Sequence, residues 1–160
     1  FFMQKILENL VEAEKSIRTL DHLLNMTFRL IKDKKIILKV LTEINKSILK
    51  IITAILQLEY LYKRITITKD ADENLRLFFA KCAKTYSLTE PEIQSIKQII
   101  YLTEQHKKSP LEFTRNDKII ITSVDMRTEV ITVSQVKNFV QTAKSFLEKT
   151  KNRIKTVIQK

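Results

Sequence analysis

Glycine is absent from the 160 residues of the chain, although average usage of about 7% would supply roughly eleven. The phosphate-binding loops of P-loop and Rossmann proteins need glycine for positive φ angles and for close backbone approach. A nucleotide site of either kind is therefore not expected. The usual glycine helix caps and tight hairpin turns are missing too, so helices must end at Asn, Lys or Pro signals instead.

Cysteine and histidine are also scarce, with one cysteine and two histidines in the chain. A single cysteine, Cys82, allows no intrachain disulfide and favours a reducing compartment, so a cytoplasmic location is expected. Its surroundings, FFAKCAKTY, fit one face of an apolar helix and favour a buried thiol over a nucleophile. With so few ligands, no zinc or iron site and no cofactor are predicted.

A membrane-spanning segment is not predicted either. The most apolar run, IITAILQLEYLY, is too short to cross a bilayer and carries Gln57 and Glu59. The chain combines 44% hydrophobic residues with 29% charged residues, interspersed along its length. This composition indicates one folded domain over residues 1–160.

Apolar residues recur at helical spacing over long stretches. Residues 2–31 predict an amphipathic helix whose stripe comprises Ile6, Leu10, Ala13, Ile17, Leu20, Leu24, Phe28 and Ile31. A second helix is predicted from Asp33 to about Tyr62, with apolar residues around more than half of its circumference. Such a helix is expected in the middle of a bundle, in contact with several partners.

Capping signals mark the later helices. Asp70 or Asp72 is expected to cap a third helix, and Ser134 to cap the last one. Thr89-Glu90-Pro91-Glu92 combines a capping box with a proline in the first turn and predicts the start of a fourth helix. That helix is expected to end near His106, ahead of Ser109-Pro110.

Residues 117–133 change in character, because two β-branched runs, KIIIT and TEVITV, flank the polar stretch SVDMR. They predict a β-hairpin with a loop that contains no glycine. The predicted fold class is therefore mainly all-α, a bundle of about five helices with a small β-hairpin before the last helix.

The formal net charge of +11 is unevenly distributed along the chain. It sums to about +5 over residues 33–69 and +6 over 114–160, and nearly cancels elsewhere. Such asymmetry favours a polyanionic partner, either nucleic acid or an acidic membrane surface. The alternative is that a Lys- and Ile-rich composition serves solubility alone.

Two groups of lysines are candidates for contacting phosphate. One opens the second helix, and the other recurs at seven-residue spacing along the last helix with one more lysine a turn later. The candidates are Lys34, Lys35, Lys39, Lys137, Lys144, Lys151 and Lys155. Neither group is interleaved with aromatic residues, so a platform for stacking bases is not predicted.

Three ionisable residues, Arg18, Asp21 and His22, fall within one turn of the first helix. A helical wheel turns His22 away from the apolar stripe and leaves Asp21 at its edge. Since a carboxylate there needs a partner, an ion pair of Asp21 with Arg18 is favoured over a catalytic cluster.

Glu59 falls inside the apolar arc of the second helix. A half-buried carboxyl group could act as an acid or base, but an ion pair with Lys63, Arg64 or another helix is favoured. His106, at the end of the fourth helix, could contact a phosphate or serve in RNA cleavage. It also fits an ordinary dipole-compensating helix terminus, which is the favoured interpretation.

The stretch AEKSIRTLDHLL and the helical layout resemble the HEPN superfamily, helical bundles associated with RNA cleavage and nucleotidyltransferase partners. KDKKIILKVLTEINKSILKIITAILQLEYLYK and HKKSPLEFTRNDKIIIT look similar to uncharacterised archaeal helical proteins. Ribonucleases of HEPN carry Arg, four to six intervening residues, then His. Arg18 and His22 have three between them, so the resemblance assigns no catalytic residue.

Three functions follow from the sequence. The favoured one is a non-enzymatic basic bundle that binds RNA or a ribonucleoprotein assembly through its two basic blocks. The second is a protein–protein interaction module or homo-oligomer, joined through the apolar arc of the second helix or the stripe of the last. The third is a HEPN-like ribonuclease that uses His22 or His106.

Overall fold

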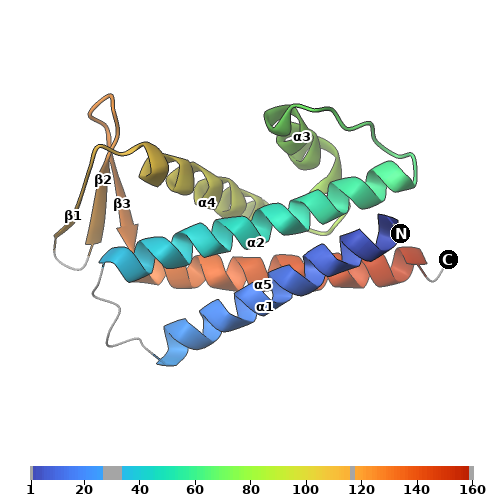
Figure 1. Ribbon diagram of the computed structural model, residues 1–160, viewed down its shortest axis with the longest axis horizontal. Helices are drawn as coiled ribbons and strands as arrows, with labels where there is room; N and C mark the ends of the chain where they lie inside the picture. The colour runs from blue at the N-terminus through green and yellow to red at the C-terminus, as the bar shows by residue number, and fades with distance from the viewer. Residues whose placement is uncertain (1, 27–33, 116–117, 159–160) are drawn as a thin grey trace.

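The computed structural model describes residues 2–26, 34–115 and 118–158. Three long helices lie lengthwise together, a fourth crosses them, and a small sheet lies at the end of the bundle opposite the two termini (Figure 1). The elements are α1 (Phe2–Met26), α2 (Lys34–Leu61), α3 (Ala71–Leu77), the π-helix η2 (Phe78–Cys82), α4 (Glu90–Lys108), β1 (Leu111–Arg115), β2 (Lys118–Thr122), β3 (Thr128–Thr132) and α5 (Val133–Ile158). The predicted mainly α-helical fold, with a small antiparallel sheet ahead of the last helix, is confirmed.

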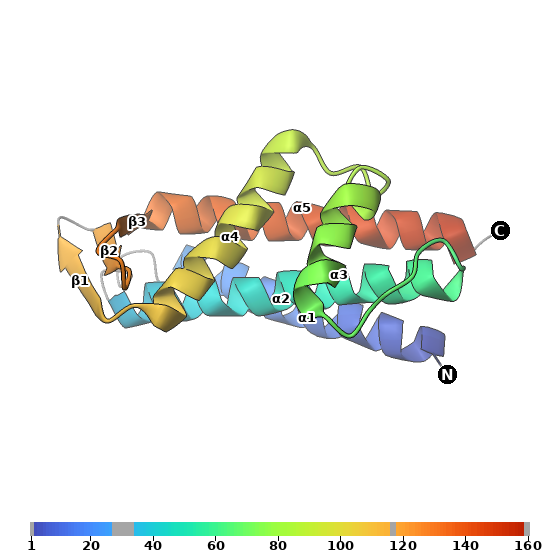
Figure 2. The same ribbon diagram turned by 90° about the horizontal axis from the view of Figure 1, so that it is seen from above.

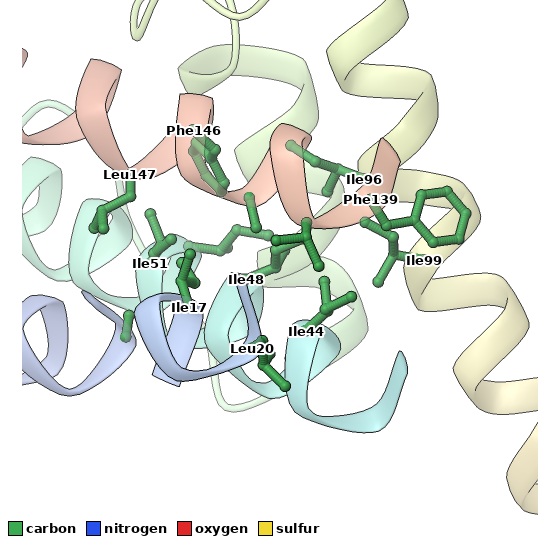
Figure 3. Close-up of a cluster of buried hydrophobic side chains, with 14 of the residues drawn as sticks. Ile17, Leu20, Ile44, Ile48, Ile51, Ile96, Ile99, Phe139, Phe146 and Leu147 are labelled. Atoms are coloured by element: carbon green, nitrogen blue, oxygen red, sulfur yellow. The ribbon is translucent and has the colours of Figure 1, made fainter. Parts of the chain in front are cut away.

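The hydrophobic core is centred on α2, which packs against α1, α4, α5 and η2. Figure 3 shows Ile48 and Ile51 of α2 among side chains from α1, α4 and α5. The stripe predicted for the first helix is buried from Ile6 to Leu24, while Phe28 and Ile31 lie outside the described residues. The wide apolar arc of α2 is thus covered within the chain, as is most of the α5 stripe. Both surfaces that the sequence suggested for an oligomer contact are therefore mostly buried within the chain.

Three residues with positive φ occupy turn positions that usually require glycine, namely Lys63 (60°), Ser87 (64°) and Met126 (67°). Lys63 lies just beyond the end of α2. Its N–H donates to the Tyr60 carbonyl, and the N–H of Arg64 donates to the Glu59 carbonyl, each at 2.9 Å. These two bonds form a Schellman motif. The left-handed conformation is less favourable by about 1 kcal/mol for a residue with a Cβ atom. Each of these three residues therefore lowers the stability of the fold by about that amount.

The helices α3, α4 and α5 begin at side-chain caps. Asp70 accepts hydrogen bonds from the N–H groups of the first turn of α3, and both bonds of the predicted capping box join Thr89 and Glu92. The predicted cap of the last helix, Ser134, is wrong. Thr132 Oγ1 accepts the Gln135 N–H at 3.0 Å, and Gln135 Oε1 accepts the Thr132 N–H at 3.5 Å. Thr132 also ends β3, so this capping box joins strand to helix directly.

The sheet has three antiparallel strands in the order β1-β2-β3. The predicted hairpin corresponds to β2 and β3, whereas β1 was not predicted. Ile119, Ile121 and Ile131 point to one face and are buried. Because side chains alternate along a strand, their neighbours in sequence form the opposite, outer face.

Candidate functional site

The lysines of α5 that were grouped as a phosphate-binding ridge lie beside α1. Lys144 Nζ is 3.0 Å from Asp21 Oδ2, and Lys151 Nζ is 3.1 Å from Glu14 Oε1. Lys137 is half-buried and Lys155 is exposed. Two of the four candidate cations are therefore matched by carboxylates of α1, which interrupts the ridge predicted for phosphate binding.

The predicted ion pair between Arg18 and Asp21 is wrong. Arg18 Nη2 lies 3.1 Å from Glu14 Oε1, one turn earlier on the same helix. Asp21 forms its ion pair with Lys144 of α5 instead. Glu followed four residues later by a cation is the favourable helical orientation, which explains the choice of Arg18. His22 is exposed, as its place on the wheel indicated. The cluster ties α1 to α5 and forms no acid/base site.

Glu92 joins α4 to α5. Besides completing the capping box, its carboxylate accepts hydrogen bonds from Ser145 and Lys149. Partial burial alone would raise the pKa of Glu92, but the bonds from Lys149, Ser145 and Thr89 outweigh it and hold the pKa at about 2. The group is therefore a charged structural link at neutral pH.

Glu59 is the buried carboxylate of α2, with 4% of its surface exposed. Arg64, a partner suggested by the sequence, holds it with Nη1 at 3.1 and 3.0 Å from the two carboxylate oxygens. The Schellman motif at Lys63 turns the chain so that Arg64 folds back over the last turn. Tyr86 donates a third bond at 2.9 Å. With three bonds Glu59 is a satisfied structural group, and its geometry does not indicate an acid or base.

The groups beside Glu59 are poorly suited to chemistry. Burial, together with the neighbouring Glu59 carboxylate, raises the pKa of the Cys82 thiol to about 11. The same two causes raise the pKa of the Tyr86 hydroxyl far above its ordinary value. Both groups stay protonated at neutral pH, so Cys82 is an inert buried thiol, as its sequence context predicted.

The candidate lysines at the start of α2 face solvent where they are described. Lys35 and Lys39 are exposed, and the side chain of Lys34 lies outside the described residues. Lys39 borders a groove of about 530 Å³ between α1 and α2, together with Lys15 and Glu43. This end of α2 lies at the end of the bundle that carries the sheet (Figures 1 and 2).

The sheet sorts its charged residues by face. On the inner face, Glu112 Oε2 lies 2.6 Å from His106 Nδ1, and Glu129 Oε1 accepts the Tyr101 hydroxyl at 2.8 Å. Both donors belong to α4, so His106 docks the sheet on this helix. The outer face instead carries Arg115 of β1 directly opposite Lys118 of β2. The acidic residues of the strands thus have partners on α4, and the basic ones lie on the opposite face.

Apolar side chains lie beside these cations on the outer face. Phe113, Ile120 and Val130 are aligned directly across the three strands. Phe113 is 40% exposed and Val130 is 45% exposed. This surface was not expected from the sequence, because β1 was not predicted. The signal was present, since LEFTR alternates and EFTRNDKII has the form of two strands around a two-residue turn.

Exposed aromatic residues occur at the opposite end as well. Tyr60 and Tyr62, at the end of α2, are 47% and 42% exposed. The second helix was predicted to extend to about Tyr62, with an apolar arc over more than half of its circumference. The helix ends at Leu61, so Tyr62 leaves that arc, and the guanidinium of Arg64 lies 5.0 Å from the centre of its ring.

Within residues 2–26, 34–115 and 118–158, no group of three or more His, Cys, Asp or Glu residues could hold a metal ion. In the same ranges no helix is long and apolar enough to span a bilayer. No protein-family model, curated protein or solved structure matches the chain, so geometry and charge alone bear on its function.

Proposed function

We propose that this protein is a non-enzymatic basic helical bundle that binds RNA or an RNA-containing assembly with the end of the molecule that carries the sheet. Basic side chains from three separate segments occur at this end. Lys39 lies near the start of α2, Lys107 in the last turn of α4, and Arg115 and Lys118 on the sheet. A cationic surface of this kind attracts the phosphate backbone and releases its counterions.

The observation that carries the proposal is the sorting of charge in the sheet. Glu112 and Glu129 are engaged by α4, and Arg115 and Lys118 face away from them with no ion pair among the described residues. On α5, by contrast, Lys144 and Lys151 already have carboxylate partners. The cations of the sheet are therefore more available to a partner than Lys144 and Lys151 of α5.

Fluorescence anisotropy of a labelled RNA, measured over a range of salt concentrations, tests the proposal. Lys39→Gln with Lys107→Gln should weaken binding about tenfold and lower the slope of log K against log salt by roughly 1.5. Lys81→Gln with Lys84→Gln removes the same charge from exposed positions near the other end and is the matched control. Equal losses in both variants, or no binding at low salt, would overturn the proposal.

A second candidate is a protein–protein interaction module, supported by apolar residues at the end that carries the termini. The exposed residues there are Phe2, Leu7, Val11, Tyr60, Leu61, Tyr62 and Ile158. A scattered set of apolar residues is ordinary, whereas a contiguous patch marks a contact surface. Light scattering at several concentrations tests the homo-oligomeric form of this candidate, which requires a mass that rises above the monomer.

A further inference from the structure

The outer face of the sheet consists of rows that run across the strands. One row is Phe113, Ile120 and Val130, and the next is Arg115, Lys118 and Thr132. Residues two apart on a strand point to the same face and lie about 6.6 Å apart. An exposed aromatic ring and two cations are therefore neighbours on one flat surface.

The basic row is an unfavourable arrangement by itself. Like charges directly opposite each other on neighbouring strands repel. The described residues of the outer face include no carboxylate, because Glu112 and Glu129 point inward. Asp117, between the two cations in sequence, lies outside the described residues. An anion placed between Arg115 and Lys118 would relieve the repulsion, which favours a negatively charged occupant.

We propose that this face binds single-stranded RNA, with a base stacked on Phe113 and the neighbouring phosphate held between Arg115 and Lys118. The proposal rests on the RNA-binding function proposed above and names the ligand class and the residues that contact it. Stacking on an exposed aromatic ring beside a basic track is the usual mode of single-strand recognition. One nucleotide spans the distance from the apolar row to the basic row.

Double-stranded RNA fits this surface poorly. In a duplex the faces of the bases are stacked on each other, so none is free for Phe113. A three-stranded sheet is also too broad for the deep, narrow major groove of A-form RNA. A duplex could use the cations alone, and its binding would not depend on the aromatic ring.

The test uses the full chain and a labelled ten-nucleotide oligouridine. Phe113→Leu keeps an apolar side chain and removes the aromatic ring, and should weaken binding about tenfold. Tyr60→Leu is the matched control, because Tyr60 is also an exposed aromatic residue but lies at the opposite end of the molecule. This variant should bind as the wild type does. Arg115→Gln with Lys118→Gln should weaken binding and lower the salt slope by about 1.4, as expected for two contacts with a single strand.

A second variant keeps the test decisive if Phe113→Leu folds poorly. The chain has no tryptophan, so Phe113→Trp introduces a single indole at the proposed contact. Its fluorescence should be quenched on binding, with affinity retained.

Two results would overturn single-strand recognition and leave the proposed function standing. One is unchanged binding of the oligouridine by Phe113→Leu. The other is an RNA duplex that binds as tightly as the oligouridine and depends on Phe113 to the same extent. No binding of any RNA by the wild type at low salt would instead overturn the proposed function. Capture of an acidic peptide in place of the oligouridine would identify the surface as a protein-docking site.

Discussion

Both α5 and the outer face of the sheet carry basic residues, but these residues have different surroundings. The lysines of α5 that face α1 have carboxylate partners, and the cations of the sheet have none among the described residues. Lys144 and Lys151 each meet a carboxylate of α1 across the helix contact. Arg115 and Lys118 meet each other, because α4 engages the carboxylates of the same strands on the other face. A run of lysines therefore says little about a binding surface until the neighbouring element is known.

A third lysine of α5, Lys149, is also paired, and its partner Glu92 of α4 has a pKa of about 2, below the ordinary value of 4.5. A carboxyl group with a lowered pKa in the folded state stabilises the fold above its unfolded pKa. That contribution, about 3 kcal/mol, is lost as the pH falls from about 4.5 to about 2. Glu92→Gln should remove most of it at pH 7 while leaving a residue suited to the capping box. Urea denaturation at pH 7 and pH 3 measures the change.

Glu90→Gln is the matched control for Glu92→Gln. Glu90 lies in the same first turn of α4 and bonds only Gln94 among the described residues, at 3.0 Å. Its substitution should change the free energy of unfolding by less than about 0.5 kcal/mol. Similar losses in the two variants would show that the ion pair with Lys149 is not the source of the stability.

The next largest change in the free energy of unfolding is expected from the contact between the sheet and α4. His106→Leu removes the donor to Glu112 and should cost about 1 kcal/mol of unfolding free energy, whereas His106→Gln, which can still donate, should cost less. RNA binding should be nearly unchanged in both variants, since His106 faces the inner side. Loss of RNA cleavage or of binding in His106→Gln would instead restore a functional role for this imidazole.

For the unpaired cations of the sheet, a substitution is expected to raise the stability of the fold slightly instead of lowering it. Lys118→Glu places a carboxylate directly opposite Arg115 and should stabilise the sheet by about 0.5 kcal/mol while weakening RNA binding. Thermal denaturation and anisotropy on the same sample measure the two quantities. A variant that is less stable and binds equally well would show that the outer row is neither repulsive nor used.

Local signals predicted the fold well. The capping box at Thr89 needs only four consecutive residues, and the stripe from Ile6 to Leu24 needs only one helix. The start of the last helix was misplaced because Thr132 and Ser134 are both good caps, and the strand that precedes it selected Thr132. The local sequence did contain a signal, because Gln135 three residues after Thr132 completes a capping-box pattern, whereas Ser134 has Lys137 at the corresponding position.

The candidate site depended on contacts between distant segments, which single-sequence patterns do not contain. Asp21 was assigned to Arg18, three residues away, but its partner is Lys144, which is 123 residues away. β1 was missed because its inward residue is the charged Glu112, stabilised by His106 of α4. β1 also lacks the run of β-branched residues from which β2 and β3 were predicted.

The most direct test of the contrast between the two basic regions compares two variants with equal loss of charge. Arg115→Gln with Lys118→Gln and Lys144→Gln with Lys151→Gln should be titrated with the same oligouridine over a range of salt concentrations. The sheet variant should lose about tenfold in affinity and about 1.4 in salt slope, while the α5 variant should keep the wild-type slope. An equal or greater loss in the α5 variant would contradict the conclusion that ion pairing with α1 removes these lysines from binding.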